Sequence, residues 1–272
     1  MRSAIAAFLL LLAGGTSASA QRADSTAHDK TFFTRADLLV AGVALGTTAA
    51  VSFFDDDVAV ASQRPRYQGS SIRSFARKAS KVQETTLTIA SLLAYGVGRV
   101  TGNRLVADVG LHAAESVVLG SLMSQAIRGP LGRTRPYVTK DTNQYDFAFG
   151  QGFKSGEEGF KHRAFPSIHT SSSVAVATVL VMETNRRHPS ATKFVAPILF
   201  AASILPGLAR IQLDQHWASD VVAGAFMGAF SGYKVVSYSH DHPDNRFDRF
   251  LLGASIAPDA RGGVRLMFSP EF

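Results

Sequence analysis

The chain has 272 residues, a formal net charge of +7 and no cysteine. This length suits one sizeable domain with a short appendage, and no internal repeat or low-complexity tract divides it. The lack of cysteine excludes thiol chemistry and cysteine-ligated metal sites. The basic balance favours anionic partners. Nucleic acid is not expected among them, because no basic stripe with interleaved aromatic residues is present.

The N-terminus carries the three regions of a secretory signal peptide. Met1-Arg2 supplies a positive charge, Ala4–Leu12 is apolar, and Ala18-Ser19-Ala20 provides small residues before a cleavage position. We therefore predict a signal peptide over residues 1–20 and an exported protein that faces the periplasm, in the cell envelope or at the membrane. An uncleaved anchor is the alternative, which the small and polar residues from Gly14 onward disfavour.

Apolar runs predict an all-α fold, a helical bundle of about six core helices. The runs are Leu38–Phe54, Thr85–Gly98, Leu105–Ile127, Thr170–Met182, Phe194–Ala209 and Val221–Tyr233. None reaches the roughly 18 uninterrupted apolar residues of a clear membrane span, so a soluble bundle and a membrane-embedded bundle both remain open.

Two polar features lie between the first two runs. Asp55-Asp56-Asp57 is interpreted as capping or solvated, because consecutive carboxylates on a helix point in different directions and do not form a cation site. Ser70–Lys81 is basic with scattered apolar residues, which is typical of an amphipathic helix on a membrane surface. A helix packed on the bundle is the alternative.

Asp108, His112 and Glu115 are spaced to give the third helix one polar face. A metal site would need further ligands that the neighbouring sequence does not supply, so we interpret this face as a polar stripe directed into the bundle.

Arg128 and Arg135 lie seven residues apart, which is two helical turns, although Gly129, Pro130 and Gly132 predict that the helix stops near Arg128. A guanidinium stays charged and offers a planar fork of donors to a phosphate. The alternative is that Arg128 and Arg133 are positive residues at a helix C-terminus.

The next 29 residues, Tyr137–Phe165, are rich in glycine and aromatic residues. A loop this long inside a compact domain is often functional, and we expect it to shape substrate access. The alternative is a structured excursion that covers the end of the bundle.

Pro166-Ser167-Ile168-His169 runs directly into an apolar stretch. Proline favours the first helical turn, so this segment predicts a helix start whose unpaired N–H groups can bind an anion. Ser167 adds a hydroxyl, and His169 can donate a proton to a departing alkoxide. An ordinary capping motif with a partly exposed histidine is the alternative.

Arg210, His216 and Asp220 form the third polar cluster. His216 and Asp220 are four residues apart, so on a helix the carboxylate can hold one ring nitrogen and leave the other free as a nucleophile. A surface ion pair is the alternative interpretation of this spacing.

The C-terminal residues change character. Ser255–Pro258 and Gly263–Phe268 flank a short polar segment and predict a small β-hairpin. We therefore divide the chain into a signal peptide (1–20), a helical domain (21–245) and a C-terminal tail (246–272).

Together, the three clusters resemble the pattern of the type 2 phosphatidic acid phosphatase superfamily, which also includes bacterial acid phosphatases and vanadium haloperoxidases. The family pattern is Lys-x6-Arg-Pro, Pro-Ser-Gly-His and Ser-Arg-x5-His-x3-Asp. Here it reads Arg128-x6-Arg135-Pro136, Pro166-Ser167-Ile168-His169 and Ala209-Arg210-x5-His216-x3-Asp220. The resemblance covers roughly residues 85–236. It implies a helical bundle with its site at the ends of several helices.

The resemblance also implies the role of each residue. His216 forms a phosphohistidine, Asp220 orients His216, and His169 protonates the leaving group. The phosphoryl oxygens are held by Arg128, Arg135, Ser167, Arg210 and the N–H of Ile168. No cofactor and no catalytic metal are implied.

Three positions depart from the family pattern: Arg128 replaces lysine, Ile168 replaces glycine and Ala209 replaces serine. The first two bear on substrate shape and rate more than on the type of reaction. Because Leu38–Phe54 has no obvious core role in the family's minimal domain, we favour membrane association.

The sequence thus predicts a metal-independent phosphatase that hydrolyses a phosphomonoester or pyrophosphate, with a lipid or lipid-linked substrate as partner. A vanadate-dependent haloperoxidase and a phosphotransferase could use the same oxyanion site, and a non-enzymatic envelope scaffold is a further alternative. The head group of the substrate and the oligomeric state are left open.

Overall fold

The computed structural model describes residues 32–242, 248, 254–258 and 264–268. The chain divides into two units, Met1–Thr34 and Arg35–Phe272, and all elements below belong to the second. The predicted signal peptide lies outside the described residues.

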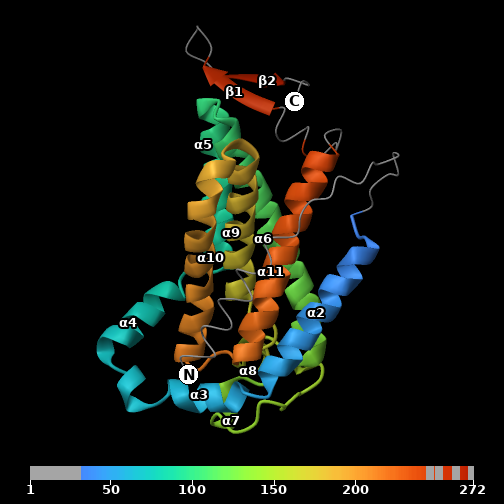
Figure 1. Cartoon of the computed structure of the whole chain (residues 1–272). Helices are drawn as coiled ribbons and strands as arrows, with labels where there is room; N and C mark the ends of the chain where they lie inside the picture. Colours follow the sequence, from blue (N-terminus) through green and yellow to red (C-terminus); the bar gives the residue numbers. More distant parts are fainter. Residues whose placement is uncertain (1–31, 243–247, 249–253, 259–263, 269–272) are drawn as a thin grey trace. The chain divides into compact units, whose positions relative to one another are not determined.

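Six long helices form a bundle, which confirms the predicted all-α fold (Figure 1). They are α2 (Arg35–Ser52), α5 (Glu84–Thr101), α6 (Arg104–Leu131), α9 (Ile168–Arg187), α10 (Pro189–Gln212) and α11 (Ala218–Asp241). Helix α9 is central and contacts α5, α6, α10 and α11, whereas α2 packs against α11.

Short helices lie at the lower end of the bundle in Figure 1. They are α3 (Asp55–Ser62), η2 (Pro65–Tyr67), α4 (Ser70–Ala79), α7 (Pro136–Thr139), η3 (Gln151–Phe153) and α8 (Gly156–Lys161). Helices α7, η3 and α8 lie along the glycine-rich segment between the first two motifs, so this segment is a structured excursion at the end of the bundle. Helix α4 packs on α10 with Ala76 buried, which favours the bundle-packed alternative for this segment.

The helices extend beyond the apolar runs that predicted them. Helices α2, α6 and α10 are long and apolar enough to cross a membrane. They reach this length with polar residues inside them or at their ends, such as Asp108 in α6, so an unbroken apolar run was too strict a criterion for a span.

Small and hydroxylated residues fill much of the bundle interior, while large apolar residues lie outside. Buried positions include Ser116 and Ser124 on α6, Thr170, Ser171 and Ala175 on α9, and Gly224, Gly228 and Ser231 on α11. Exposed positions include Leu38, Leu39 and Leu45 on α2, Leu92 and Leu93 on α5, Leu122 on α6, and Phe194 and Ile198 on α10. This distribution is typical of helices that pack together inside a lipid bilayer.

Close packing of α11 on α9 depends on three glycines spaced one turn apart. A Cβ atom on Gly228 would lie 2.2 Å from the carbonyl oxygen of Ser171, and one on Gly224 would lie 2.4 Å from that of Ser167. A Cβ on Gly232 would meet the Ala175 carbonyl oxygen at 2.8 Å. Only glycine lets the two backbones approach this closely.

Helix α6 ends at Leu131, three residues later than the sequence predicted, because Pro130 is accommodated in its last turn. Gly132 then ends the helix with a left-handed φ of 61°. A Cβ there would lie 1.9 Å from the carbonyl oxygen of Ala148. This turn directs Arg133 and Arg135 away from the helix axis and across the end of the bundle.

The predicted C-terminal hairpin is present as β1 (Ala254–Pro258) and β2 (Val264–Phe268), which pair antiparallel with Ile256 opposite Leu266.

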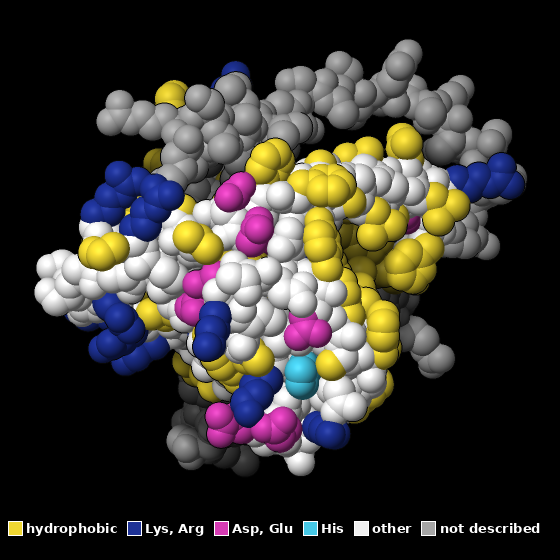
Figure 2. Space-filling model, turned by 90° about the horizontal axis from the view of Figure 1, so that it is seen from below, with side chains coloured by type: hydrophobic (Ala, Val, Ile, Leu, Met, Phe, Trp, Pro, Cys, Tyr) yellow, Lys and Arg dark blue, Asp and Glu magenta, His cyan; other side chains and the backbone are white. Residues whose placement is uncertain are grey.

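Basic and hydrophobic side chains are distributed unevenly over the end of the molecule that carries α7 and α8. Figure 2 views this end and shows Lys and Arg side chains gathered toward one edge, with hydrophobic side chains along the other. The basic edge lies on the side of α4, whose sequence includes Arg73, Arg77 and Lys78. An anionic lipid head group would be attracted to such a surface.

Candidate active site

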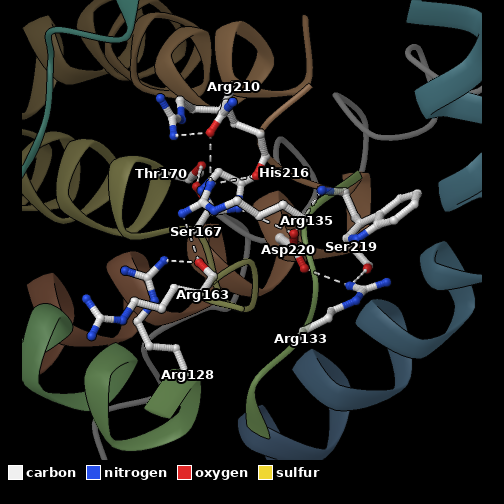
Figure 3. A network of polar contacts seen from close by, with 12 residues as sticks. Arg128, Arg133, Arg135, Arg163, Ser167, Thr170, Arg210, His216, Ser219 and Asp220 are labelled. Atoms are coloured by element: carbon white, nitrogen blue, oxygen red, sulfur yellow. Dashed lines mark hydrogen bonds and ion pairs between the residues drawn. The ribbon is translucent and has the colours of Figure 1, made fainter. Parts of the chain in front are cut away.

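The three motifs converge at one end of the bundle (Figure 3). Arg128 lies in the last turn of α6, His169 in the first turn of α9, and Arg210 in the last turn of α10. His216 lies between α10 and α11, and Asp220 is in the first turn of α11. The structure therefore brings together all eight residues that the sequence singled out.

His216 and Asp220 form the buried pair that the spacing predicted. The ring Nδ1 lies 3.3 Å from Oδ2 of Asp220, and the two side chains are 1% and 0% exposed. The surface ion pair alternative is therefore wrong. The backbone N–H of Trp217 also donates to Oδ2 at 2.8 Å, which fixes the carboxylate at the start of α11. Because Nδ1 of His216 faces Asp220, Nε2 is the ring nitrogen that is available to react.

Arg133 anchors the other side of Asp220. Its Nη1 donates to Oδ1 of Asp220 at 2.7 Å and its Nη2 donates to Oδ2 of Asp55 at 2.8 Å. Ser219 joins this network, because its N–H donates to Asp55 at 2.8 Å and its hydroxyl accepts from Arg133 at 2.7 Å.

This network corrects two interpretations of the sequence. Asp55 is fully buried rather than solvated. Arg133 is 2% exposed and pairs with two carboxylates, so it is not a cap at the end of α6. Neither role could be predicted from the sequence, because Asp55 and Arg133 are 78 positions apart. An aspartate directly after the uncharged run 38–54 was the available signal.

The guanidiniums of Arg128, Arg135 and Arg210 donate to oxygen atoms of two residues, Arg163 and Gln215. Nη2 of Arg128 and Nη2 of Arg135 both donate to the backbone oxygen of Arg163, at 2.5 and 3.1 Å. Gln215 connects Arg135 to Arg210, since its backbone oxygen accepts from Arg135 at 2.7 Å and its side-chain oxygen accepts from Arg210 at 3.3 Å. Arg163 and Gln215 were missed by sequence reasoning, because the backbone oxygens with which they accept from Arg128 and Arg135 leave no signature in residue type.

The second motif begins α9 as predicted, with Ser167 as the N-cap residue, but Pro166 lies one position before the cap and not in the first helical turn. Ser167 donates its N–H to the backbone oxygen of Asp220 at 3.0 Å, which joins the starts of α9 and α11. Its hydroxyl accepts from Thr170 at 3.1 Å and makes no capping bond. Ile168 is buried, so its branched side chain is directed into the bundle.

His169 faces His216 across the site, with ring centroids 6.5 Å apart. These two imidazoles come from the same end of neighbouring helices, which suits one for attack on a phosphorus atom and the other for proton transfer to the leaving group.

Positive charge and burial set the protonation of the loop residues. Burial, followed by the charges of Arg135, Arg210 and Arg128, holds the pKa of His216 well below its usual value. His216 is therefore a neutral imidazole at neutral pH. Burial and the neighbouring Arg210 and Arg128 lower the pKa of Arg135 to about 9, so this side chain remains cationic at neutral pH.

The site is suited to an oxyanion. The buried Nε atoms of Arg128 and Arg210 have no hydrogen-bond partner among the described residues. Three guanidiniums beside a neutral imidazole leave a local excess of positive charge, which a tetrahedral anion would compensate.

A family model, the PAP2 superfamily, matches residues 109–244, which is half of the chain. The chain belongs to the PAP2 superfamily. The match includes every polar residue of the three motifs, and the family resemblance expected from the sequence is thereby confirmed.

Curated relatives are lipid A phosphatases. The chain is 32% identical over 75 residues to a lipid A 1-phosphatase of Porphyromonas gingivalis, covering 28% of this chain and 16% of that protein. It is 26% identical over 135 residues to a lipid A 1-phosphatase of Rhizobium etli, covering 49% of this chain and 52% of the relative. The matches thus span about half of the relatives' length or less.

Among solved structures, the chain is similar to a transmembrane PAP2 type phosphatidylglycerolphosphate phosphatase from Bacillus subtilis. The TM-score is 0.57 at 18% identity, over 77% of this chain and 98% of the other. This likeness shows the fold. With the three long apolar helices and the apolar exterior, it supports membrane association of this chain.

Proposed function

We propose that this PAP2 protein is a metal-independent phosphatase that hydrolyses a lipid or lipid-linked phosphomonoester or pyrophosphate through a phosphohistidine at His216. The observation that carries the proposal is the buried His216–Asp220 pair beside three guanidiniums. Phosphoryl transfer depends mainly on positioning and on neutralising charge at the equatorial oxygens, and arginines can supply both.

In the first step, Nε2 of His216 attacks phosphorus and the ester P–O bond breaks. Asp220 holds Nδ1 and stabilises the ring as it becomes positively charged. Arg128, Arg135 and Arg210 hold the equatorial oxygens. His169 donates a proton to the departing oxygen, and the bound dianion favours the protonated form of His169 because it offsets the guanidinium charges.

In the second step, water attacks the phosphorus of the phosphohistidine. His169 now accepts the proton of that water, the P–N bond breaks, and inorganic phosphate and neutral His216 are released. Each proton that His169 gives in the first step is thus recovered in the second. Ser167 and the N–H of Ile168, at the positive end of α9, contribute further donors to the oxyanion.

An apolar groove beside the site supports a lipid substrate. The groove has a volume of about 400 Å³ and is lined by Phe75 and Val82 near α4, by Val176 and Leu180 on α9, and by Leu199 on α10. Ser173 also lines the groove, and its hydroxyl donates to the backbone oxygen of His169 at 2.8 Å. An acyl chain in this groove would leave its phosphate next to the imidazoles.

The proposed location is the periplasmic face of the cell envelope. The N-terminal pattern of charge, apolar run and small residues is that of an export signal. A basic edge and exposed aromatic residues at the site end, such as Phe149 and Phe153, suit a position at a lipid head-group layer.

Phosphate release by the purified protein in detergent tests the proposal. The substrates are phosphatidic acid, undecaprenyl pyrophosphate, lipid A and a soluble aryl phosphate. We expect turnover of at least one lipid substrate, no turnover by His216→Ala, and normal turnover by His188→Ala, a histidine at the other end of α9. Equal turnover by both variants would exclude His216 from the reaction.

A variant that fills the groove tests the lipid assignment separately. Leu180→Trp should lower turnover of lipid substrates about tenfold or more while preserving turnover of the aryl phosphate, since a bulky ring occupies the volume of the chain. Ile198→Trp is the control, because Ile198 is exposed on the outside of α10. A similar loss for both substrates in Leu180→Trp would contradict the groove as the chain-binding site.

A further inference from the structure

A second polar cluster lies at the end of the bundle opposite the candidate active site. His112 comes from α6, Glu183 from the last turns of α9 and His240 from the last turn of α11. The interpretation of His112 as part of a polar face inside the bundle is confirmed. The expectation that no further metal ligands lie nearby was wrong, because α9 and α11 bring Glu183 and His240 to it from distant parts of the sequence.

The three side chains converge on one point. Nδ1 of His112 and Nε2 of His240 each lie 2.8 Å from Oε1 of Glu183. All three atoms are within 4.8 Å of one another, and His112 and Glu183 are almost fully buried. Two imidazole nitrogens and one carboxylate oxygen form a ligand set that zinc accepts in proteins.

We propose that this cluster is a structural site for a divalent transition metal ion of the zinc type, held by Nδ1 of His112, Nε2 of His240 and Oε1 of Glu183. Tetrahedral bonds of about 2.1 Å place neighbouring ligand atoms about 3.4 Å apart. The two nitrogen–oxygen distances would therefore widen by about 0.6 Å, which small side-chain rotations provide.

Outer partners already orient the ligands. Nε2 of His112 lies 2.9 Å from the hydroxyl of Ser239, and that hydroxyl donates to Asp248. Arg187 donates to Oε2 of Glu183 at 3.0 Å and pairs with Asp108. Such hydrogen bonds fix the ring tautomer and leave Oε1 as the single coordinating oxygen of Glu183.

The charge balance also favours a cation. Three carboxylates lie beside the imidazoles or their hydrogen-bond partners, namely Asp108, Glu183 and Asp248. Arg187 is the cation that the structure pairs with two of them. A divalent ion would offset this excess of negative charge. Protonation of both imidazoles would also offset the negative charge, and the zinc content of the protein distinguishes a bound ion from protonated imidazoles.

The site has a route for the metal and a clear structural effect. The His240 side chain is 24% exposed, so an ion can enter and a water can complete the coordination. The ion would clamp α6, α9 and α11 at one end, while the same helices carry Arg128, Ser167 and Asp220 at the other. A clamp there would stiffen the frame without touching the phosphate.

Metal content and thermal stability of the purified, untagged protein test the proposal. After stripping with a chelator and adding Zn²⁺, we expect one zinc per chain and a Tm several degrees higher. Substitution of Co²⁺ should give the visible absorption bands of a four-coordinate site. His240→Ala should lose the zinc and the rise in Tm, whereas His242→Ala, two residues away in the chain, should keep both.

Wild-type protein that takes up no stoichiometric zinc would overturn the proposal and assign the cluster to protonated imidazoles. Zinc uptake that persists unchanged in His240→Ala would overturn it as well. If His240→Ala does not fold, His240→Gln replaces it, and the wild-type stoichiometry remains decisive. None of these results depends on phosphatase activity.

Discussion

Asp220 is the residue on which the geometry of the proposed nucleophile depends. One carboxylate oxygen accepts from Arg133, and the other faces His216 and accepts from the backbone of Trp217. Arg133 in turn divides its charge between Asp220 and Asp55. Because all of these groups are buried, each carboxylate needs its partner to remain charged.

Arg133 can therefore be tested as a positioning residue. Arg133→Lys keeps the charge but loses the fork, so it should lose one charge-assisted hydrogen bond worth about 1.5–3 kcal/mol. We expect kcat to fall about 10-fold or more with little change in KM, because the residue does not contact the phosphate. Steady-state kinetics checks this, with Arg186→Lys as the control at the far end of α9. An unchanged kcat in Arg133→Lys would show that the network does not support His216.

The pH dependence of catalysis tests the electrostatics of His216. Burial, together with Arg135 and its neighbours, holds the pKa of His216 well below the usual value, so the imidazole stays neutral and nucleophilic as the pH falls through 6.5. In Arg135→Gln this pKa should rise, and the acid limb of kcat/KM should move to higher pH. Titration of the substrate is the same for both proteins and cancels in the comparison. Identical acid limbs in the two proteins would contradict the account.

At the scale of elements, the close contact of α9 and α11 aligns the site. Gly224 and Gly228 let the start of α11 lie against the start of α9, where Ser167 donates to the backbone of Asp220. The proposed nucleophile and the proposed oxyanion donors come from these two helices. Their spacing therefore sets the spacing of the chemistry.

Gly228→Val should disturb this contact. The added Cβ would lie 2.2 Å from the carbonyl oxygen of Ser171, so the helices must separate, at a cost of about 1–3 kcal/mol or more. We expect a Tm lower by about 2–4 °C for each kcal/mol, together with reduced kcat. Thermal unfolding in detergent measures the first effect. Gly42→Val on α2 is the control, since nothing lies within 4 Å of its Cβ position. Equal Tm values for the two variants would contradict the packing argument.

The long helices were predictable because their apolar runs have the length and composition of bundle helices. All six are present, extended at their ends by polar residues such as Glu84 and Asp241 that the apolar criterion excluded. The three motifs were predictable because their spacing carries chemistry. What the sequence could not provide were contacts between distant segments, such as Asp55 with Arg133 or His112 with Glu183 and His240.

At the scale of the whole molecule, the distribution of side chains favours a membrane protein. Many leucine and phenylalanine side chains lie outside the bundle, and many serine, alanine and glycine residues lie within it. In water, this arrangement would expose a large apolar surface, whereas in a bilayer the same surface is solvated by lipid tails. Removal of the proposed zinc ion with a chelator should lower Tm without acting on the candidate active site, because His112, Glu183 and His240 lie at the opposite end of the bundle.

Membrane association and processing can be measured together. We expect the protein to remain in the membrane fraction after an alkaline carbonate wash, because three helices can span the bilayer. N-terminal sequencing of that material should begin at Gln21, as the signal peptide interpretation predicts. Release of the protein into the wash would contradict the membrane assignment, and a sequence beginning at Met1 would contradict cleavage.

The most direct test of the central claim is trapping of the phosphoenzyme. After brief reaction with a substrate labelled in its phosphoryl group, the wild-type protein should carry a label that is stable in base and lost in acid, as expected of phosphohistidine. His216→Ala, confirmed as folded by its thermal transition, should carry no label. A label that persists in His216→Ala, or one that is stable in acid and lost in base, would contradict His216 as the nucleophile.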